Sequence, residues 1–191
     1  MPFEIAARRA KVAGKRAYPR GKVYGLIEPG PVVLVTTVRD GKPDVMAMSW
    51  LTMLEFEPPL VGCVMSNRNY SFDSLVAARE CGINIPTVEL APKVVKCGNA
   101  SGRSVDKFAR FALTPVPATR IAPPLVAECY ANLECRVVDD RMVEPYGFFV
   151  LEVVAAWIDP ARKEPRQIHH RGNGVFAVDG RRLLKLASRM K

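Results

Sequence analysis

The sequence predicts a mainly β fold, a closed or nearly closed antiparallel β-barrel with two or three helices inserted after its third strand. Three observations predict this fold. Segments rich in β-branched residues alternate with turn signals, helical spacing is confined to residues 71–111, and two long strand-like segments follow that stretch. Antiparallel strands of this kind commonly close into barrels. The chain has 191 residues, which is the length of one domain.

The first strands are predicted by residues 31–38 (PVVLVTTV), which are mostly β-branched. The Asp-Gly pair at 40–41 is a strong hairpin signal, and residues 43–50 alternate as the return strand. Residues 60–66 predict a third strand after a Glu-Pro-Pro break. We therefore expect an antiparallel meander in the first third of the chain.

Helical spacing follows the third strand. We expect Ser71 to be the N-cap of a helix that ends at residues 81–82, because serine favours N-caps and glycine favours the position after a helix. Residues 87–96 predict a second helical stretch capped by its threonine, and Ser104 is expected to cap a short third helix.

The rest of the domain is predicted to be extended. Residues 83–86 form a short strand, and the four prolines within 114–124 indicate an ordered loop. Residues 125–138 and 147–158 predict two long strands. Residues 167–178 predict a hairpin of two short strands around a Gly-Asn-Gly turn.

The net charge of +9 is concentrated at the two ends of the chain. Residues 1–22 carry a net charge of +6 and residues 181–191 a net charge of +5, whereas residues 23–180 carry −2. We therefore divide the chain into a basic N-terminal extension, a slightly acidic domain over 23–180 and a basic C-terminal tail. Nucleic-acid-binding proteins usually carry basic charge on a folded face, so a basic nucleic-acid-binding module is a minor alternative.

No apolar stretch follows the basic N-terminal residues, and no run of about 18 apolar residues occurs, so we expect a cytoplasmic protein without a membrane span. The five cysteines are odd in number and none has CxxC spacing, which favours buried thiols over disulfides or zinc. His169 and His170 are adjacent and would face opposite sides of a strand, so they could not hold one metal together.

The sequence lacks the GxSxG, P-loop, HExxH and GxGxxG signatures. Candidate chemistry is instead concentrated in four segments, residues 44–50, 58–66, 69–72 and 102–108. They suit a flat aromatic ligand with a phosphate tail.

The ring and the phosphate would use different side chains. An apolar, polarizable surface for a ring comes from Met48, Trp50, Val64 and Met65. Ser71 is expected at a helix N-terminus, where phosphate binds readily, and Lys107 could neutralise an anion. The same residue types also suit an ordinary core and an ordinary helix cap, and their spacing leaves both interpretations open.

The order and identity of the four segments resemble the flavin reductase-like family of FMN-binding split barrels, which includes the flavoredoxins. The resemblance is carried by MAMSWLTMLEFEPPLVGCVMS, then NYSF, GINIP and SGRSVDKF, and it covers roughly residues 25–178. It implies a Greek-key split barrel that binds FMN and forms a homodimer, with FMN near the dimer interface.

The resemblance also implies which residues bind FMN. Ser71 would contact the phosphate. Relatives often carry asparagine where this chain has Asp44, whose ionised carboxylate accepts hydrogen bonds but cannot donate them. Together with Met65 from the ring surface above, the expected cofactor-binding residues are Asp44, Met48, Ser49, Trp50, Met65, Ser66, Ser71, Gly102, Lys107 and Phe176.

By the same resemblance the redox chemistry belongs to N5 of FMN rather than to a protein side chain, with NADH or NADPH as a candidate cosubstrate. Lys107 or nearby backbone N–H groups are hypothesised to stabilise negative charge at the N1/O2 end of the reduced flavin. Two redox functions remain open beside the minor nucleic-acid-binding alternative. One is an NAD(P)H-dependent flavin oxidoreductase, and the other is a flavoredoxin-type electron carrier that serves a redox partner protein without oxidising NAD(P)H.

Overall fold

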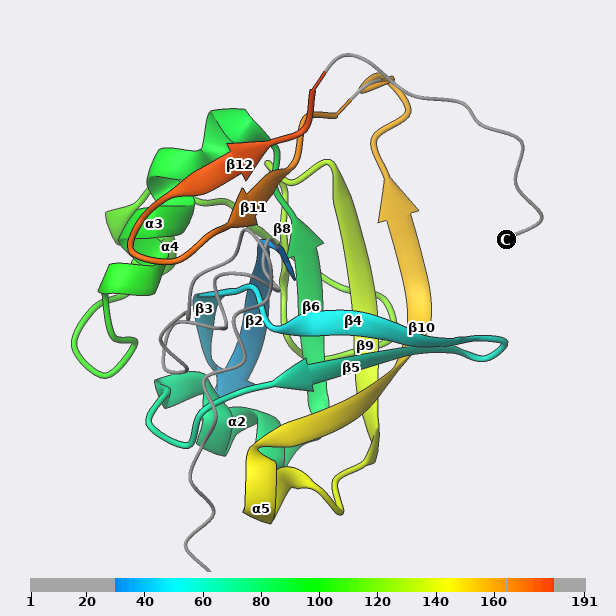
Figure 1. The fold of residues 1–191 in the computed structure, drawn as a ribbon. Coiled ribbons are helices and arrows are strands. Elements are labelled where there is room, and N and C mark those ends of the chain that lie inside the picture. The colour runs from blue at the N-terminus through cyan, green and yellow to red at the C-terminus, as the bar shows by residue number, and fades with distance from the viewer. Residues whose placement is uncertain (1–29, 164, 181–191) are drawn as a thin grey trace, which may run out of the picture.

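A computed structural model describes residues 30–163 and 165–180 (Figure 1). The basic segments 1–22 and 181–191 lie outside the described residues. One seven-stranded antiparallel sheet dominates, with the strand order β3-β2-β6-β9-β10-β5-β4. This confirms the mainly β prediction. The strands are β2 (Val33–Arg39), β3 (Lys42–Met48), β4 (Leu51–Phe56), β5 (Pro59–Val64), β6 (Glu80–Ile85), β9 (Ala131–Asp139) and β10 (Phe148–Ile158).

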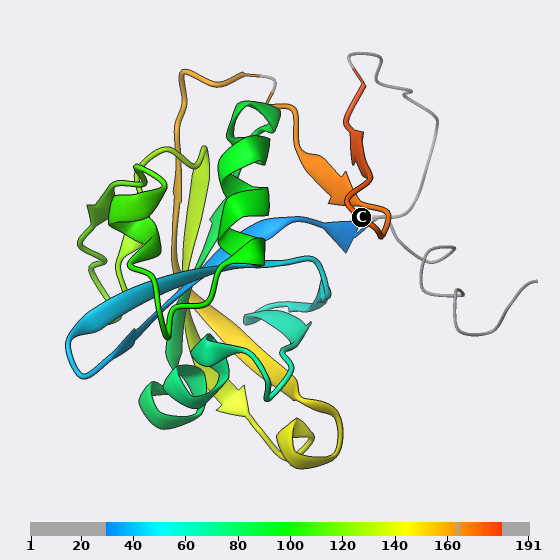
Figure 2. The same cartoon turned by 90° about the vertical axis from the view of Figure 1, so that its left-hand side faces the viewer.

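The sheet curls into an open barrel because its two edge strands are joined directly. β3 and β4 stand at opposite ends of the hydrogen-bonding order, yet only Ser49 and Trp50 separate them in the chain. Across a flat sheet the edges would lie about 29 Å apart, at about 4.8 Å per strand. Three Cα steps span at most about 11 Å. The edges must therefore approach each other, and Figures 1 and 2 show the sheet bent round on itself.

Two smaller sheets accompany the barrel. The predicted C-terminal hairpin is confirmed, and its turn contains Gly172, Asn173 and Gly174, all with positive φ. In the three-stranded sheet this hairpin pairs with a short N-terminal strand. The strands are β1 (Gly30–Pro31), β11 (Ile168–His170) and β12 (Phe176–Val178), and a separate pair consists of β7 (Pro115–Val116) and β8 (Leu125–Val126).

The helices lie at one end of the barrel and along one side of it (Figure 1). α2 and α5 are at the end, where α2 packs against β2, whereas α3 and α4 pack against β3. No helix in the described part of the chain is both long and apolar enough to cross a bilayer. The helices are α2 (Tyr70–Ala78), the 3-10 helix η2 (Val88–Leu90), α3 (Ala91–Asn99), α4 (Lys107–Arg110) and α5 (Val143–Tyr146).

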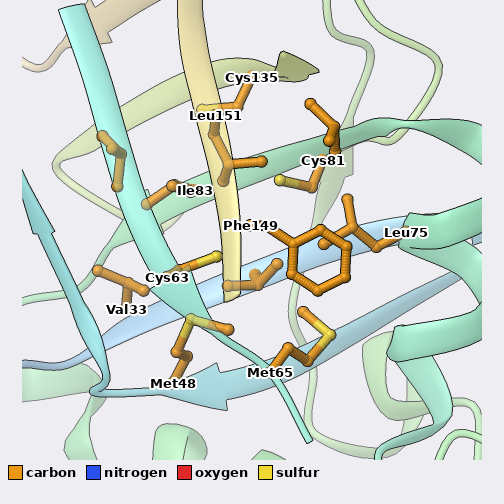
Figure 3. Packing of buried hydrophobic residues seen from close by; sticks show 13 residues of the cluster. Val33, Met48, Cys63, Met65, Leu75, Cys81, Ile83, Cys135, Phe149 and Leu151 are labelled. Atoms are coloured by element: carbon orange, nitrogen blue, oxygen red, sulfur yellow. The ribbon is translucent and has the colours of Figure 1, made fainter. Parts of the chain in front are cut away.

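Two apolar clusters form because β2 is buried on both of its faces. Val33 and Val35 belong to the cluster inside the barrel, whereas Val32 and Leu34 belong to a second cluster under α3 and α4. This explains why β2 has a nearly continuous apolar sequence instead of an alternating one. Inside the barrel, side chains from the strands and from α2 point toward one another (Figure 3). The barrel cluster consists of Val33, Val35, Met48, Val61, Cys63, Met65, Leu75, Cys81, Ile83, Cys135, Val137, Phe149 and Leu151.

The predicted meander is wrong in its pairing. The third predicted strand exists as β5, but it pairs with β4 and β10 rather than with the return strand β3. Strand β4 was not predicted from the sequence. Its LTMLEF segment lacks regular apolar–polar alternation, and five of its six residues are exposed. A strand that pairs at a sheet edge and buries little leaves no periodic signal.

Both ends of the first predicted helix are wrong. The N-cap is Asn69, not Ser71, and the helix ends at Ala78 with Arg79 in the left-handed conformation (φ 56°). The Arg79 amide donates to the Leu75 carbonyl oxygen at 2.9 Å, so a non-glycine residue performs the role that the prediction gave to Gly82. Gly82 instead lies in β6, where an added Cβ would sit 2.4 Å from Oγ1 of Thr36.

Two further boundaries differ from the prediction. The short helix α4 is capped by Asp106, which accepts a hydrogen bond from the Ala109 amide at 3.1 Å, and not by Ser104. The long strand expected over 125–138 is broken by a turn between β8 and β9. Asn84 holds the two pieces together, because its Oδ1 accepts from the Val126 amide at 2.9 Å and from Nδ2 of Asn132 at 2.8 Å.

Candidate functional site

A buried ion pair lies at the centre of the site. Nζ of Lys107, at the start of α4, lies 3.2 Å from Oδ1 of Asp44 on β3, and the two side chains are 3% and 5% exposed. The same ammonium group donates to the carbonyl oxygen of Val45 at 2.7 Å. Ser71, in the first turn of α2, donates its hydroxyl to Oδ2 of Asp44 at 2.7 Å. Three residues predicted for the site are therefore in direct contact, although they come from three different elements.

Gly102 packs against this cluster from the loop that precedes α4. An added Cβ at Gly102 would lie 2.5 Å from Oδ1 of Asp44 and 2.5 Å from Cδ1 of Tyr70. Any larger residue would have to displace the carboxylate or the tyrosine ring. The position therefore needs glycine for close approach rather than for an unusual φ.

A polar pocket of about 270 Å³ opens above the cluster, between the start of α2 and the loop after α3. The first amides of a helix have no intrahelical acceptor and carry partial positive charge, and Arg68 adds a full charge to the lining. Burial raises the pKa of the Cys97 thiol in the same wall to about 11, so this side chain is uncharged. The pocket suits an anion. Its lining comprises Met46, Ala47, Arg68, Asn69, Tyr70, Ser71, Cys97, Gly98, Asn99, Ala100, Ser101, Gly102 and Lys107.

A large pocket of about 690 Å³ adjoins the polar pocket and shares Met46, Ala47 and Asn69 with it. It lies beside the link between β3 and β4, and its mouth carries the exposed aromatic side chains of Trp50 and Tyr146. Five residues predicted for the site line it: Met48, Ser49, Trp50, Met65 and Ser66. The lining is completed by Met46, Ala47, Val64, Asn67, Asn69, Phe72, Val143, Glu144, Pro145, Tyr146 and Gly147.

The wall of the large pocket formed by α5 is fixed by Gly147. This residue has φ 64°, and an added Cβ would lie 2.4 Å from the carbonyl oxygen of Met65. The Met65 amide donates to the Gly147 carbonyl oxygen at 2.9 Å, which joins α5 to the end of β5. Helix α5 was not predicted as part of the site, because a four-residue helix has no periodic signal.

Phe176 lies in a third, side pocket of about 350 Å³ between α3 and the C-terminal hairpin. Its ring packs on His170 with ring centroids 5.2 Å apart. The side pocket shares Ala47, Met48 and Ser49 with the large pocket. Phe176 is therefore near the other predicted residues but does not line the same pocket.

Within the described residues, no group of three or more histidine, cysteine, aspartate or glutamate side chains could hold a metal ion. Nε2 of His169 lies 2.9 Å from Oδ1 of Asp179. Arg68 and Tyr146 line the pockets but were not selected from the sequence, and Asn69 belongs to the predicted 69–72 segment but was not chosen as a cofactor-binding residue. For Arg68 and Asn69 the signal was present, because they come directly before a helix start.

Curated proteins share sequence with this chain over most of the domain. An uncharacterized protein of Archaeoglobus fulgidus is 34% identical over 113 residues, which span 59% of this chain and 64% of that protein. The uncharacterized protein YddH of Escherichia coli is 31% identical over 173 residues, which span 83% of this chain and 91% of that protein. A third relative is the reductase component of a 4-nitrophenol 4-monooxygenase/4-nitrocatechol 2-monooxygenase from Rhodococcus opacus. It is 33% identical over 125 residues, and the match spans 65% of this chain and 64% of that component. The chain thus spans slightly less than two thirds of the first and third of these relatives.

Solved structures share the fold. The FMN-binding domain of a flavin reductases-like enzyme from Shewanella baltica is 26% identical, with a TM-score of 0.74 over 89% of this chain and 96% of that one. A flavoredoxin from Methanosarcina acetivorans is 25% identical, with a TM-score of 0.77 over 93% and 97% of the two chains.

The family described as flavin reductase like domain matches residues 26–176. This range contains the whole seven-stranded sheet and every residue that lines the three pockets. The resemblance found in the sequence is thereby confirmed, and the chain belongs to the flavin reductase-like family.

Proposed function

We propose that this chain is a flavoprotein oxidoreductase that binds one FMN and passes electrons from NAD(P)H or a reduced partner through it. One observation carries the proposal: a large, mostly apolar pocket is joined to a small, polar, positively charged one. FMN has the same division, since its flat ring system continues through a ribityl chain into a phosphate.

The pocket residues fit the two ends of FMN. The large pocket, at about 690 Å³, lies within the range of about 300–1,000 Å³ that is typical of ligand sites. Met48 and Met65 offer it buried, polarizable thioether side chains, which suit an aromatic ring. Arg68 and the first turn of α2 offer the polar pocket donors and positive charge, which suit the phosphate.

FMN bound in this way would supply hydride and electron transfer chemistry at its N5. The protein residues would bind, orient and shield it. Buried Met48 and Met65 would exclude water from the inner face of the ring, and the main chain of Ser49 would lie beside its edge. Trp50 is 54% exposed and Tyr146 67% exposed, so the outer side of the site stays open to an electron donor or acceptor.

The relatives support this proposal in both of its forms. The Shewanella baltica structure is described as FMN-binding, and the Rhodococcus opacus relative is a reductase component. A flavoredoxin-type carrier without NAD(P)H oxidation is the second candidate. It is favoured by the exposed mouth of the large pocket, which a partner protein could reach, and by the likeness to a flavoredoxin.

The test begins with an absorbance spectrum of the purified full-length chain and chromatography of the released chromophore. We expect flavin bands and FMN in a one-to-one ratio, or stoichiometric binding of FMN added to colourless protein. Anaerobic NADH, NADPH and dithionite then separate the two candidates. Bleaching by a nicotinamide supports the oxidoreductase, and bleaching by dithionite alone supports the carrier. A chain that neither contains nor binds FMN contradicts both candidates.

We also propose that the chain forms a homodimer through β4. Within the described residues β4 pairs with a strand on one side only, and an exposed apolar edge of this kind is a common interaction surface. Met53, Leu54 and Phe56 are 54%, 45% and 73% exposed on this strand. Trp50 directly precedes it, so a partner on β4 would lie beside the mouth of the large pocket.

A further inference from the structure

The geometry points to an indirect role for Lys107. It is a positioning residue that acts through Asp44 to fix Ser71 and the first turn of α2, and it does not itself bind the anion. This inference rests on the proposed function, because it concerns how the polar pocket holds the phosphate of a flavin. It replaces the hypothesis in which Lys107 supplies its charge directly to the flavin.

The ammonium group of Lys107 already has partners. An ammonium group has three donors, and Nζ lies 2.7 Å from the carbonyl oxygen of Val45 and 3.2 and 3.5 Å from the two carboxylate oxygens of Asp44. Its side chain is only 3% exposed. Lys107 therefore contributes to the floor of the polar pocket but has little free capacity for a ligand.

The buried carboxylate of Asp44 requires the positive charge of Lys107 beside it. Its carboxylate is 5% exposed and lies beneath a pocket suited to an anion. An unpaired buried carboxylate is strongly unfavourable, and its charge would also repel a phosphate. Lys107 cancels that charge, so its loss would weaken phosphate binding even without a direct contact.

Ser71 transmits the effect to the helix. Its hydroxyl has one proton, which it donates to Oδ2 of Asp44 at 2.7 Å, so it cannot also donate to a ligand. The hydrogen bond instead ties the first turn of the nine-residue helix α2 to β3. The donors left for the phosphate are the free amides of that turn and the guanidinium group of Arg68.

A pair of variants tests this role in the full-length chain, with dissociation constants measured for FMN and for riboflavin. Riboflavin carries the same ring without the phosphate. We expect Lys107→Met to weaken FMN binding about tenfold or more and to change riboflavin binding little. The double variant Asp44→Asn/Lys107→Met removes both charges and should bind FMN within about threefold of wild type, because replacing both members of a buried pair is far less harmful than removing one.

A control variant and a second measurement complete the comparison. Lys96→Met removes an exposed positive charge from α3, next to Cys97 in the pocket wall, and should leave FMN binding unchanged. Hydrogen exchange of the flavin-free chain gives a readout independent of the ligand. The hydrogen-bonded amides of Asn69 and Phe72 should exchange faster in Lys107→Met than in Lys96→Met or the double variant.

A direct lysine–phosphate contact predicts the opposite result for the double variant. If that variant binds FMN as weakly as Lys107→Met, while its riboflavin affinity and melting temperature match wild type, the positioning role is overturned. Unchanged amide exchange in Lys107→Met would also overturn it. Failure of the proposed function is distinguishable, because the wild-type chain itself would then not bind FMN.

Discussion

Lys107 and Asp44 are 63 positions apart in the sequence, and their side chains form an ion pair with an Nζ–Oδ1 distance of 3.2 Å that is almost fully buried. Both residues were expected to touch a ligand. Their contact with each other links the stability of the fold to the shape of the polar pocket, because the same carboxylate accepts the hydroxyl of Ser71.

Removal of one member of this pair should destabilise the fold. We expect Lys107→Met to lower the free energy of unfolding by about 3–5 kcal/mol, since it leaves a buried carboxylate without a counter-charge. Urea denaturation of the flavin-free chain measures this. Arg141→Met is the matched control, because the Arg141–Asp139 pair is on the surface and should contribute little. Equal stability of the two variants would show that the buried pair is not held as described.

Gly102→Ala should damage the same cluster without any change of charge. The new methyl group would lie 2.5 Å from Oδ1 of Asp44 and Cδ1 of Tyr70, so we expect destabilisation of about 1–3 kcal/mol and weaker FMN binding. Gly98→Ala is the control. It lines the same pocket, but its Cβ would meet Ala47 at an ordinary 3.6 Å and would favour the helix. Thermal melting and FMN titration of the two variants check this contrast, and equal behaviour would contradict it.

The site residues were selected through the family resemblance. The strand-forming segments were largely predictable, because apolar patterning and turn chemistry are local. Val33 to Val38, the Asp-Gly turn and the Gly-Asn-Gly hairpin were recognised in this way. Which strands pair with each other was not predictable. That β5 pairs with β10, across more than 80 residues of chain, depends on closure of the whole sheet.

The errors within the site have specific physical causes. Ser71 was expected to be an N-cap because serine favours that position, but Asp44 competes for its hydroxyl from a strand 27 residues away. Arg79 ends α2 in a conformation that sequence rules reserve for glycine or asparagine. Lys107 and Asp44 were both selected from the sequence, whereas their contact with each other followed only from the tertiary fold.

The dimer proposal predicts that a charge on β4 disrupts association. Phe56 is 73% exposed on the edge strand, so Phe56→Glu should shift the chain toward monomer in sedimentation velocity. Val138→Glu is the control, since this 47% exposed valine lies on β9 in the middle of the sheet. A wild-type chain that is already monomeric at high concentration would refute the proposal.

The buried cysteines should be unreactive while the chain is folded. Burial is the largest cause that raises the pKa of Cys63 and Cys129 to about 12 and of Cys97 to about 11, and thiolates are the reactive form. A thiol reagent at pH 8 should label the native chain slowly and label all five cysteines rapidly in denaturant. Fast stoichiometric labelling of the native chain would mean that a cysteine is exposed or activated.

Glu134 should make stability depend on acidic pH. Burial alone would raise the pKa of this carboxyl group, but hydrogen bonds from the Thr119 and Arg120 amides, the Thr119 hydroxyl and the Trp157 indole outweigh burial and lower it. A group whose pKa is lower in the folded state contributes stability above its unfolded pKa and loses it as pH falls through the folded value. The contribution should therefore be complete at neutral pH, begin to fall near the unfolded pKa of about 4.3, and be lost as the pH drops through the lower folded pKa.

Glu134→Gln isolates this contribution. The glutamine would keep one accepting oxygen, but its NH2 group would face donors, so we expect a loss of about 1–3 kcal/mol at pH 7. The difference from wild type should shrink as the pH falls, because a protonated Glu134 also loses acceptor capacity. Urea denaturation between pH 7 and pH 3 measures it, followed by tryptophan fluorescence, to which Trp157 contributes with its Nε1 2.8 Å from Oε1 of Glu134. A difference that stayed constant over this range would show that the carboxylate charge does not hold the 114–124 loop to the barrel.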